Sequence, residues 1–433
     1  MIDFQNTENW NLYRKEKLSG NVTGIWNNAT FLGASSYPIF PYHYLTSDFS
    51  SFEKNIYEKP TKIIYHLSGY GASFVESLVS FVGESSERYA YTLTKKTLEK
   101  NIVKLSYFEL KKKFANDLVV PLKYININYP SDSLEHNVNE NDRISWVRMN
   151  SLIELGKFVW MPLQLVQMFD DESFNYEKRY ANTAVSTGTA SQETIIKAIN
   201  SAIVEYLQID SFNLWWFNGI KGKTVSNSID FISEKCFGGS ISFENFKNNF
   251  QIKFTDISFD KSIFVIVCEI FAKDSHGNLP KYTVGVQGGL SKNNCIYRSF
   301  MEALTVLEYS MNLCWIHPDK YLSAKNKNNI DNLDDNVLMY ALKGKPKLNH
   351  VTKYFHVNKI NSTYDLISSL SNFSKYAGFL NITPVEFEYL NLNIARVIIP
   401  ELLPVALPTF PPQRHPRFKQ FGGIINRVAH PLA

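Results

Sequence analysis

Residues 80 to 90 read Ser80-Phe-Val-Gly-Glu84-Ser-Ser-Glu87-Arg88-Tyr-Ala90, and this stretch decides how the fold is interpreted. On a helix, four polar side chains fall at i, i+4, i+7 and i+8 and share one stripe: Ser80, Glu84, Glu87 and Arg88. Two neighbouring carboxylates repel unless a cation lies between them, and Mg²⁺ accepts one or two carboxylates together with phosphate oxygens. The adjacent arginine suits a phosphate. The alternative is a solvated helix face crossed by Glu–Arg pairs.

The residues before this stripe complete a recognisable motif. An apolar run predicts a helix over 72–92, and Ser68-Gly-Tyr-Gly-Ala72 reads as a Gly-rich loop that follows a strand at 61–66. A Gly-rich loop followed by a helix with Ser-x3-Glu-x2-Glu-Arg resembles the first nucleotide-binding motif of the YcaO family.

A second small-residue loop begins near residue 182 and leads into another amphipathic helix. It resembles the second YcaO motif, which ends in Glu-x2-Glu-Arg-Asp. Glu205 and Asp210 match this ending, whereas Gln208 and Ile209 replace the second Glu and the Arg, and Lys197 replaces another family glutamate. Acids are lost and an ammonium is gained, so we expect fewer Mg²⁺ ions or a differently bound nucleotide. A Lys197 side chain pointing into the site would replace a metal or contact a phosphate directly. The Gln-Ile-Asp-Ser form resembles the branch of the streptolysin-type toxin-maturing enzymes.

Two further segments resemble parts of the same family. Gly285-Val-Gln-Gly-Gly289 ends an apolar strand and leads to Arg298 and Glu302, similar to a third motif, although an ordinary helix with surface charges fits equally well. The Pro-rich tail, residues 400–433, cannot form a helix or a central strand. It is either a solvated linker or ligand for an aromatic groove, or the counterpart of the tail of peptide-cyclising YcaO enzymes, whose terminal carboxylate enters the active site.

The resemblance implies a mixed α+β fold, ATP and Mg²⁺ as cofactors, and a set of site residues. Those implied to hold Mg²⁺ are Glu84, Glu87 and Glu205. Those implied to contact the nucleotide are Ser80, Arg88, Lys197, Gln208, Arg298 and Glu302. Those implied to be catalytic are Glu84, Glu205 and Ala433, the last through its carboxylate as a base.

The resemblance also implies an activity. It is that of an ATP-dependent cyclodehydratase subunit, which converts Cys, Ser or Thr residues of a ribosomally made precursor peptide to thiazolines or oxazolines by phosphorylating the amide oxygen, as in bacteriocin or toxin maturation. Implied partners are a ThiF-like leader-binding protein, a precursor with a Cys/Ser/Thr-rich core and a flavin-dependent azoline dehydrogenase; a homodimer is compatible with it. Two alternatives stay open: thioamide or amidine formation, and a non-catalytic scaffold subunit, suggested by Lys197, Gln208 and Ile209.

Bulk properties narrow the class of protein. The chain has 433 residues, 44% of them hydrophobic and 20% charged, which predicts a packed globular core. A formal net charge of +4 is too small to indicate nucleic acid. The N-terminus lacks the features of a signal peptide, and no apolar run approaches membrane-spanning length. The four cysteines have no zinc-site or disulfide spacing, which predicts a cytoplasmic protein. We expect one YcaO domain over 61–433, including the tail, after a covering segment at 1–60.

Periodicity predicts the remaining elements. Expected helices cover 95–113, 191–218, 294–313 and 360–376. Expected strands cover 146–149, 158–161, 229–233, 251–257, 263–271 and a buried strand from 396. Expected loops cover 128–143 and 324–336.

Overall fold

The structure is a computed structural model of the 433-residue chain. It describes residues 24–26, 31–34, 42–50, 66–128, 134–167, 177–178, 180–181, 186–273, 280–316, 319, 330, 333–406, 408 and 411–432. The chain forms two compact units. The first comprises Met1–Ala34, His43–Ile203 and Leu370–Pro400, and the second comprises Ser35–Tyr42, Val204–Ser369 and Glu401–Ala433. The expected division into residues 1–60 and 61–433 stays a prediction.

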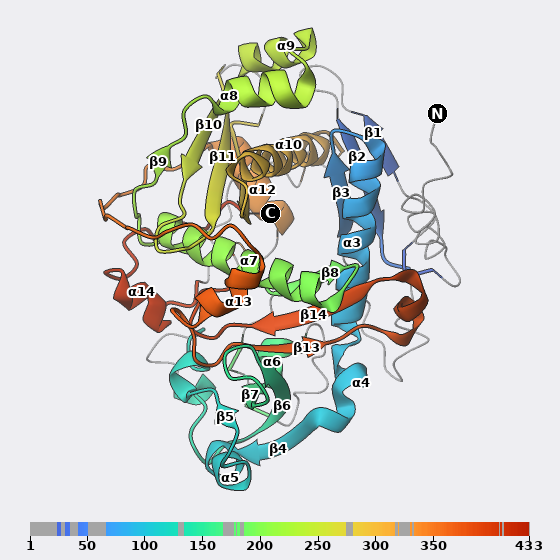
Figure 1. The fold of residues 1–433 in the computed structure, drawn as a ribbon. Helices are drawn as coiled ribbons and strands as arrows, with labels where there is room; N and C mark the ends of the chain where they lie inside the picture. The colour runs from blue at the N-terminus through green and yellow to red at the C-terminus, as the bar shows by residue number, and fades with distance from the viewer. Residues whose placement is uncertain are drawn as a thin grey trace. The chain divides into compact units, whose positions relative to one another are not determined.

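The first unit contains a small antiparallel sheet that leads into the first motif. Its strands are β1 (Phe31–Ala34), β2 (His43–Asp48) and β3 (His66–Gly71), in that order. The helix α3 (Phe74–Thr92) follows directly and packs against β2 and β3 (Figure 1). Ser73 caps this helix, since its side chain accepts a hydrogen bond from the Glu76 N–H at 3.3 Å.

A larger sheet completes the first unit. Its order is β5-β7-β6-β13-β14-β8, with β4 also paired to β6, and only β5 and β7 run parallel. The strands are β4 (Ile102–Ser106), β5 (Leu118–Val119), β6 (Arg143–Ser151), β7 (Phe158–Pro162), β8 (Thr189–Gln192), β13 (Gly378–Asn381) and β14 (Asn393–Ile398). The helices are α4 (Thr94–Leu98), α5 (Tyr107–Lys113) and α6 (Leu163–Val166), with 3₁₀ turns at Glu99–Asn101, Leu122–Tyr124, Leu134–His136 and Val385–Leu390. Leu67, Phe81 and Trp146 belong to one buried apolar core of this unit.

The second unit is built around a four-stranded antiparallel sheet, in the order β12-β11-β10-β9. The strands are β9 (Lys223–Thr224), β10 (Phe250–Asp256), β11 (Phe264–Ala272) and β12 (Tyr282–Gly289). The helices are α7 (Ile195–Trp216, which begins in the first unit), α8 (Ser228–Phe231), α9 (Ile241–Asn249), α10 (Lys292–Ile316), α12 (Leu333–Lys343), α13 (Tyr364–Leu370) and α14 (Pro416–Gln420), with a π turn at Ile232–Cys236.

The long helix α10 packs directly on β11 and β12 (Figure 1). Gly285 of β12 permits this approach, because a Cβ there would lie 2.3 Å from the Ser299 carbonyl oxygen and 2.5 Å from the Ala303 nitrogen. The mixed α+β fold predicted from the sequence is confirmed. Among the described residues, no helix is both long and apolar enough to cross a membrane.

The long periodic segments were predicted correctly. The helices expected at 72–92, 191–218 and 294–313 are α3, α7 and α10, although β8 occupies the start of the second. The strands expected at 251–257 and 263–271 are β10 and β11. The strands expected at 146–149, 158–161 and from 396 lie within β6, β7 and β14.

Shorter segments account for the errors. The supposed Gly-rich loop from Ser68 to Gly71 is strand β3. The helix expected at 95–113 is interrupted by β4, which pairs with β6, because tertiary pairing overrides local helix preference there. The strand expected at 229–233 is helical, since a short apolar run does not distinguish the two states. The helix expected at 360–376 covers only Tyr364–Leu370. Most of 324–336 and the strand expected at 61–66 lie outside the described residues.

Candidate functional site

The acidic stripe of the first motif is fixed to the preceding strand. Glu84 of α3 accepts two hydrogen bonds at Oε2, from the Ser68 N–H at 3.2 Å and from the Ser68 hydroxyl at 3.0 Å. A carboxylate that accepts such bonds is held in one orientation. Ser80 lies one turn before Glu84 on the same helix and is half-buried.

Arg88 lies between the two acids of this stripe. Its Nε is 3.9 Å from Oε1 of Glu84, and its Nη1 is 3.4 Å from Oε1 of Glu87. The Glu–Arg pairing of the alternative interpretation is therefore present. The three side chains are not a freely solvated face, however, because only 28% of Glu84, 18% of Glu87 and 15% of Arg88 is exposed. The guanidinium offsets the repulsion between the two carboxylates in this structure.

A close contact between strand and helix positions the stripe. A Cβ on Gly69 of β3 would lie 2.2 Å from the backbone nitrogen of Phe81 and 2.3 Å from the carbonyl oxygen of Ser77. Glycine is needed there because the backbones of β3 and α3 touch. The sequence drew attention to this glycine correctly, but it lies in a strand rather than a loop, and the physical reason for it is close packing against α3.

In the second unit, Gln208 and Glu302 bind the same strand. Gln208 Oε1 accepts a hydrogen bond from the Gly288 N–H at 2.7 Å, and Glu302 Oε2 accepts one from the Val286 N–H at 2.7 Å. Since β12 is an edge strand, these side chains also satisfy N–H groups that would otherwise lack a strand partner. Glu205 is half-buried, three residues before Gln208 on α7.

Glu302 has the titration behaviour expected of a functional carboxyl. Burial raises the pKa of Glu302 from 4.5 to about 7, although the Val286 N–H and the nearby Arg298 act to lower it. A carboxyl whose pKa is near neutrality changes charge in the working range of an enzyme, and such groups are enriched at functional sites.

Lys197 lies on the surface of the first unit. Its Nζ is 2.8 Å from Glu193 Oε2, and the two side chains are 61% and 65% exposed. Lys197 of α7 therefore pairs with an acid four residues earlier, just before the helix begins. A role for Lys197 at a phosphate stays a prediction.

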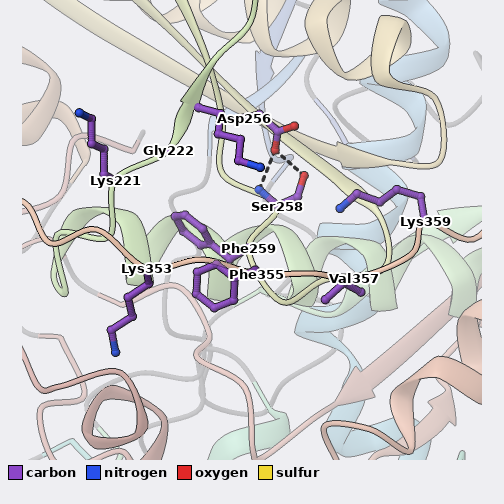
Figure 2. A pocket seen from close by; sticks show the side chains of 10 residues that line it. Lys221, Gly222, Asp256, Ser258, Phe259, Lys353, Phe355, Val357 and Lys359 are labelled. Atoms are coloured by element: carbon purple, nitrogen blue, oxygen red, sulfur yellow. Dashed lines mark hydrogen bonds between the residues drawn. The ribbon is translucent and has the colours of Figure 1, made fainter.

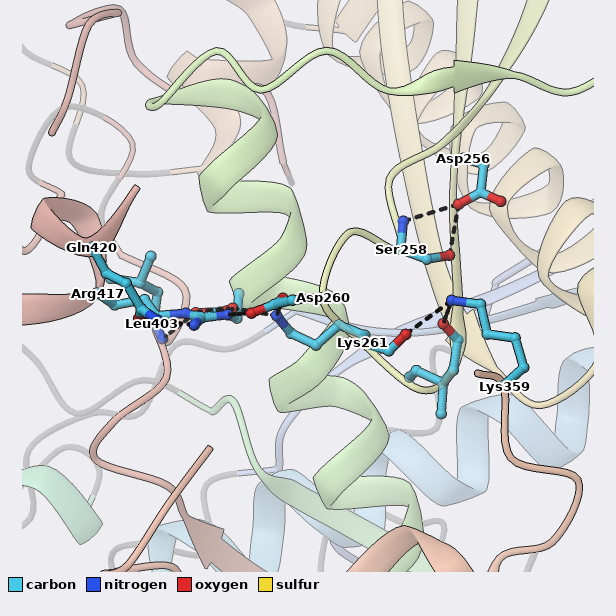
Figure 3. A network of polar contacts seen from close by, with 10 residues as sticks. Asp256, Ser258, Asp260, Lys261, Lys359, Leu403, Arg417 and Gln420 are labelled. Atoms are coloured by element: carbon cyan, nitrogen blue, oxygen red, sulfur yellow. Dashed lines mark hydrogen bonds and ion pairs between the residues drawn. The ribbon is translucent and has the colours of Figure 1, made fainter. Parts of the chain in front are cut away.

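Asp210, the matched acid at the end of the second motif, lies in a buried ionic network with Lys261 and Arg417, the two partners that Figure 3 labels. Its carboxylate is 2.7 Å from Lys261 Nζ and 2.8 Å from Arg417 Nη2, and it accepts the Leu403 N–H at 3.0 Å. Burial acts to raise the pKa of Asp210, but Arg417 and Lys261 outweigh it and hold that pKa well below 3.8. The network fixes the tail to α7. The sequence analysis did not predict Lys261 and Arg417 as partners of Asp210. The available signal was a single acid in an otherwise apolar run.

The end of the tail is also fixed. Asn336 Nδ2 donates to the carbonyl oxygens of His430 and Leu432, each at 2.9 Å, and Trp216 Nε1 donates to that of Val428 at 3.0 Å. His430 and Leu432 are buried, so the solvated-linker interpretation is wrong for this end of the tail. Ala433 lies outside the described residues, so its role as a base stays a prediction.

The donor set on α3 fits a magnesium-bound nucleotide. Within the described part of the chain, no three His, Cys, Asp or Glu side chains gather closely enough to form a metal cage. Mg²⁺ bound to a nucleotide needs only one or two carboxylates, because phosphates and water supply the other ligands. Glu84 and Glu87 are two such carboxylates beside the guanidinium of Arg88, and their roles at Mg²⁺ and phosphate stay predictions. A common site with Glu205, Gln208, Arg298 and Glu302 stays a prediction.

Sequence comparison supports this interpretation. A family model described as a YcaO cyclodehydratase that binds ATP and Mg²⁺ matches residues 68–403. The match includes all the residues singled out above except those of the tail. No curated protein matches the chain in sequence.

Several solved structures share the fold at low sequence identity. A heterocyclase in complex with substrate and cofactor is 17% identical, with a TM-score of 0.65 over 92% of this chain; the present chain spans about half, 52%, of its length. A chain of the E. coli microcin synthetase McbBCD complex with pro-MccB17 bound is 14% identical, with a TM-score of 0.54, 89% of this chain and 91% of that chain being covered. YcaO from Methanopyrus kandleri, bound with AMPPCP and Mg²⁺, is 12% identical, with a TM-score of 0.53 and coverage of 93% and 95%.

Proposed function

This chain belongs to the YcaO cyclodehydratase family, and we propose that it is an ATP-dependent subunit that forms azolines in a ribosomally made precursor peptide. The observation that carries the proposal is the α3 stripe, in which Glu84 and Glu87 share one face with Arg88 between them. Family membership alone indicates ATP and Mg²⁺, whereas the stripe provides the side chains that would bind them.

The proposed reaction joins a substrate side chain to the preceding backbone carbonyl. The thiol of a Cys, or the hydroxyl of a Ser or Thr, loses its proton and adds to the carbonyl carbon, and the carbonyl oxygen becomes an oxyanion. This oxyanion takes the terminal phosphoryl group of ATP, and ADP leaves. Departure of inorganic phosphate, with loss of the amide proton, forms the C=N bond, so the peptide loses one water. In such a transfer the protein mainly positions groups and neutralises charge.

Residues of the first motif account for the binding of the nucleotide. Mg²⁺ neutralises phosphate charge, and Glu84 and Glu87 are its proposed protein ligands together with Glu205. Arg88 pairs with the carboxylates of Glu84 and Glu87, and it would exchange these partners for phosphate oxygens when the metal neutralises the acids. Ser80 would donate its hydroxyl to the same phosphates.

Residues of the second and third motifs account for the remaining contacts. Gln208 is proposed as a neutral hydrogen-bonding partner, and Arg298 as a phosphate donor. Glu302 is proposed to change its charge when nucleotide binds, because its pKa near 7 makes the proton easy to release.

The proposal includes partner proteins. A precursor peptide supplies the Cys, Ser or Thr residues, a ThiF-like partner presents it, and a flavin-dependent dehydrogenase acts on the product. One structural relative is part of a multi-protein synthetase complex with a precursor bound, which supports this arrangement by analogy of fold.

A reconstituted reaction tests the proposal. The chain, the leader-binding partner and the precursor are incubated with ATP and Mg²⁺, and each ring is detected as the loss of one water from the peptide mass. Precursor variants that lack Cys, Ser and Thr must remain unmodified, which distinguishes azolines from amidines. Glu84→Gln should abolish both ATP turnover and water loss, because it removes a metal ligand but keeps a hydrogen-bond acceptor for Ser68.

The matched control is Glu99→Gln, the same substitution at an exposed glutamate of the same unit. It should retain wild-type turnover. Wild-type turnover in Glu84→Gln would show that the stripe is structural only. ATP-independent stimulation of a modifying partner by the chain would instead support the scaffold alternative.

A further inference from the structure

A lysine-rich cavity lies in the second unit, apart from every residue that the family motifs single out. Its volume is about 140 Å³, and three chain segments form its lining (Figure 2). One segment contributes Lys353, Phe355 and Lys359, a second contributes Lys221 and Lys223, and a third contributes Phe259. We call this cavity the lysine pocket.

One wall of the lysine pocket has strand-like alternation. Lys353, Phe355, Val357 and Lys359 all line the pocket, so every second side chain faces inward. The intervening residues are exposed, and Tyr354 is 86% exposed. This is the pattern of an extended ribbon with one face directed to a ligand cavity and the other to solvent.

The backbone of this wall has an unused hydrogen-bonding edge. Val351 forms a parallel bridge to Ile220, with its N–H donating to the Gly219 carbonyl oxygen at 2.8 Å. The next backbone hydrogen bond is from the Ile360 N–H to Ser262, at 2.9 Å. Between these points, residues 352–359 make no backbone hydrogen bond to any described residue. An extended segment with a free edge is a template for an added strand.

The lining carries an excess of positive charge. Four lysines and one acid, Asp256, line the cavity, and that carboxylate already accepts two hydrogen bonds from Ser258, at 2.9 Å and 2.6 Å. Lys359 donates to backbone carbonyl oxygens, and burial lowers its pKa while Asp256 acts to raise it. The ammonium groups of the exposed Lys221 and Lys223 form no ion pair within the described chain, so they remain available to an anion.

Two aromatic rings form the apolar part of the pocket. The centroids of Phe259 and Phe355 are 5.5 Å apart, and Figure 2 shows the two rings beside one another. Phe259 has a φ of +43°, which is uncommon for a bulky residue and is retained only where the surroundings enforce it. The strained backbone therefore holds an apolar surface among the lysines.

We propose that the lysine pocket binds an extended, acidic segment of the peptide substrate. The peptide backbone pairs with residues 352–359, its carboxylates meet Lys221 and Lys223, and one apolar side chain contacts Phe259 and Phe355. The identity of the peptide rests on the proposed function, whereas the binding chemistry does not. A peptide fits better than a nucleic acid, because the lining offers a free backbone edge and contains no arginine.

Binding of a synthetic peptide to the full chain tests this proposal without ATP or a partner protein. The probe is a fluorescent octapeptide of alternating glutamate and leucine, followed by anisotropy. Three control ligands should not bind. They are the corresponding lysine–leucine peptide, an oligothymidylate of equal charge, and the same acidic peptide N-methylated at every amide. Preference for the oligothymidylate, or equal binding of the basic or N-methylated peptide, would overturn the proposal.

Charge reversal locates the site. Lys221→Glu combined with Lys223→Glu should weaken binding of the acidic probe at least tenfold, and both side chains are exposed, so folding should be unaffected. The matched control is Lys281→Glu combined with Lys343→Glu, two exposed lysines of the same unit outside the lining, which should keep wild-type Kd. If the acidic probe has the same Kd for the pocket double variant as for the control double variant, the proposal is wrong. Binding and ring formation are read separately, so ring formation without probe binding rejects only the pocket, and probe binding without ring formation rejects only the proposed function.

Discussion

Arg417 of the tail contacts Asp210 of α7 through two nitrogens, with Nε at 3.1 Å and Nη2 at 2.8 Å from the same carboxylate oxygen. Lys261 approaches the same carboxylate, and Asp260 accepts from Arg417 at 2.6 Å (Figure 3). Asp210 and Lys261 have no exposed side-chain surface, so their charges are compensated within the network, by each other and by Arg417 and Asp260, rather than by water. The helix that carries the second motif is thereby fixed to the tail.

Removal of the central carboxylate should destabilise the protein strongly. In Asp210→Asn, Arg417 and Lys261 keep Asp260 as their acid, and that side chain is 20% exposed. Breaking a buried ion pair from one side costs about 3–5 kcal/mol. The free energy of unfolding from a urea titration should therefore fall by that amount.

The comparison variant for this network is Lys157→Gln. Lys157 pairs with Glu154 at the surface, where the side chains are 53% and 33% exposed. Exposed pairs contribute about 0–1 kcal/mol, so this variant should remain near wild-type stability. A loss in Asp210→Asn as small as that in Lys157→Gln would mean that the network adds no stability.

Lys197→Ala should separate stability from nucleotide affinity. The ion pair with Glu193 is exposed, so its loss should change the free energy of unfolding by no more than about 0.5 kcal/mol. If Lys197 contacts a phosphate, calorimetry should show weaker ATP binding in this variant. Glu193→Gln also breaks the pair but keeps the ammonium, and it should bind ATP as wild type does. Wild-type affinity in Lys197→Ala would restrict Lys197 to the surface pair.

The charge of Glu302 should make stability depend on pH. Its pKa is about 7 in the folded chain and 4.5 ordinarily, so between these values the folded state keeps a proton that the unfolded state has released. The contribution of Glu302 to stability should therefore fall as pH rises from 4.5 to 7 and then level off, by about 1.4 kcal/mol for each unit of pKa difference. Glu302→Gln should lose this slope, because its amide oxygen still accepts the Val286 N–H without titrating.

Urea unfolding at several pH values measures this effect. The curve of Glu302→Gln is subtracted from that of wild type, which cancels the other titrating groups. Parallel curves across pH 4.5 to 7 would contradict the assigned pKa. If Glu302 loses its proton when nucleotide binds, as proposed, binding should also release a proton, detectable as a buffer-dependent enthalpy.

The sequence predicted correctly those features that depend on the spacing of nearby residues alone. The stripe on α3 followed from helical spacing, and the structure places Glu84, Glu87 and Arg88 on it together. The sequence placed Gly69 in a Gly-rich loop. Glycine is needed there because the backbone contacts Phe81, and that contact joins a strand and a helix that meet only in the folded chain. The local sequence pattern therefore located the motif correctly but predicted a loop where the structure has strand β3.

Long-range partners could not be read from the sequence. The pairing of Asp210 with Arg417 joins residues separated by 207 positions, and the sequence around either residue does not indicate its partner. The alternation from Lys353 to Lys359 is visible in the sequence, but its meaning depends on Phe259 and Lys221, which come from distant segments. Sites assembled from several segments need the fold.

His430 gives the tail its own pH dependence. Its Nε2 donates to the Ala406 carbonyl oxygen at 2.7 Å, its Nδ1 accepts the Leu432 N–H at 3.3 Å, and its ring meets the edges of Phe212 and Phe217. Burial lowers the pKa of His430 from 6.5 to about 4, with the hydrogen bond to Ala406 acting in the opposite direction. A neutral imidazole with one donor and one acceptor nitrogen is therefore required for this arrangement.

Acid should loosen the tail through His430. Below pH 6.5 the unfolded state takes up a proton that the folded state refuses until about pH 4, so the contribution of His430 to stability falls progressively as pH drops between these values. His430→Gln should show a lower stability at pH 7 but a flatter decline, because its amide cannot take up the proton. The matched control is His350→Gln, an exposed histidine of the same unit, whose decline should follow wild type. The readout is urea unfolding from pH 7 to 5 with limited proteolysis of the tail. A decline of equal steepness in wild type and His430→Gln would remove His430 as the origin of acid sensitivity.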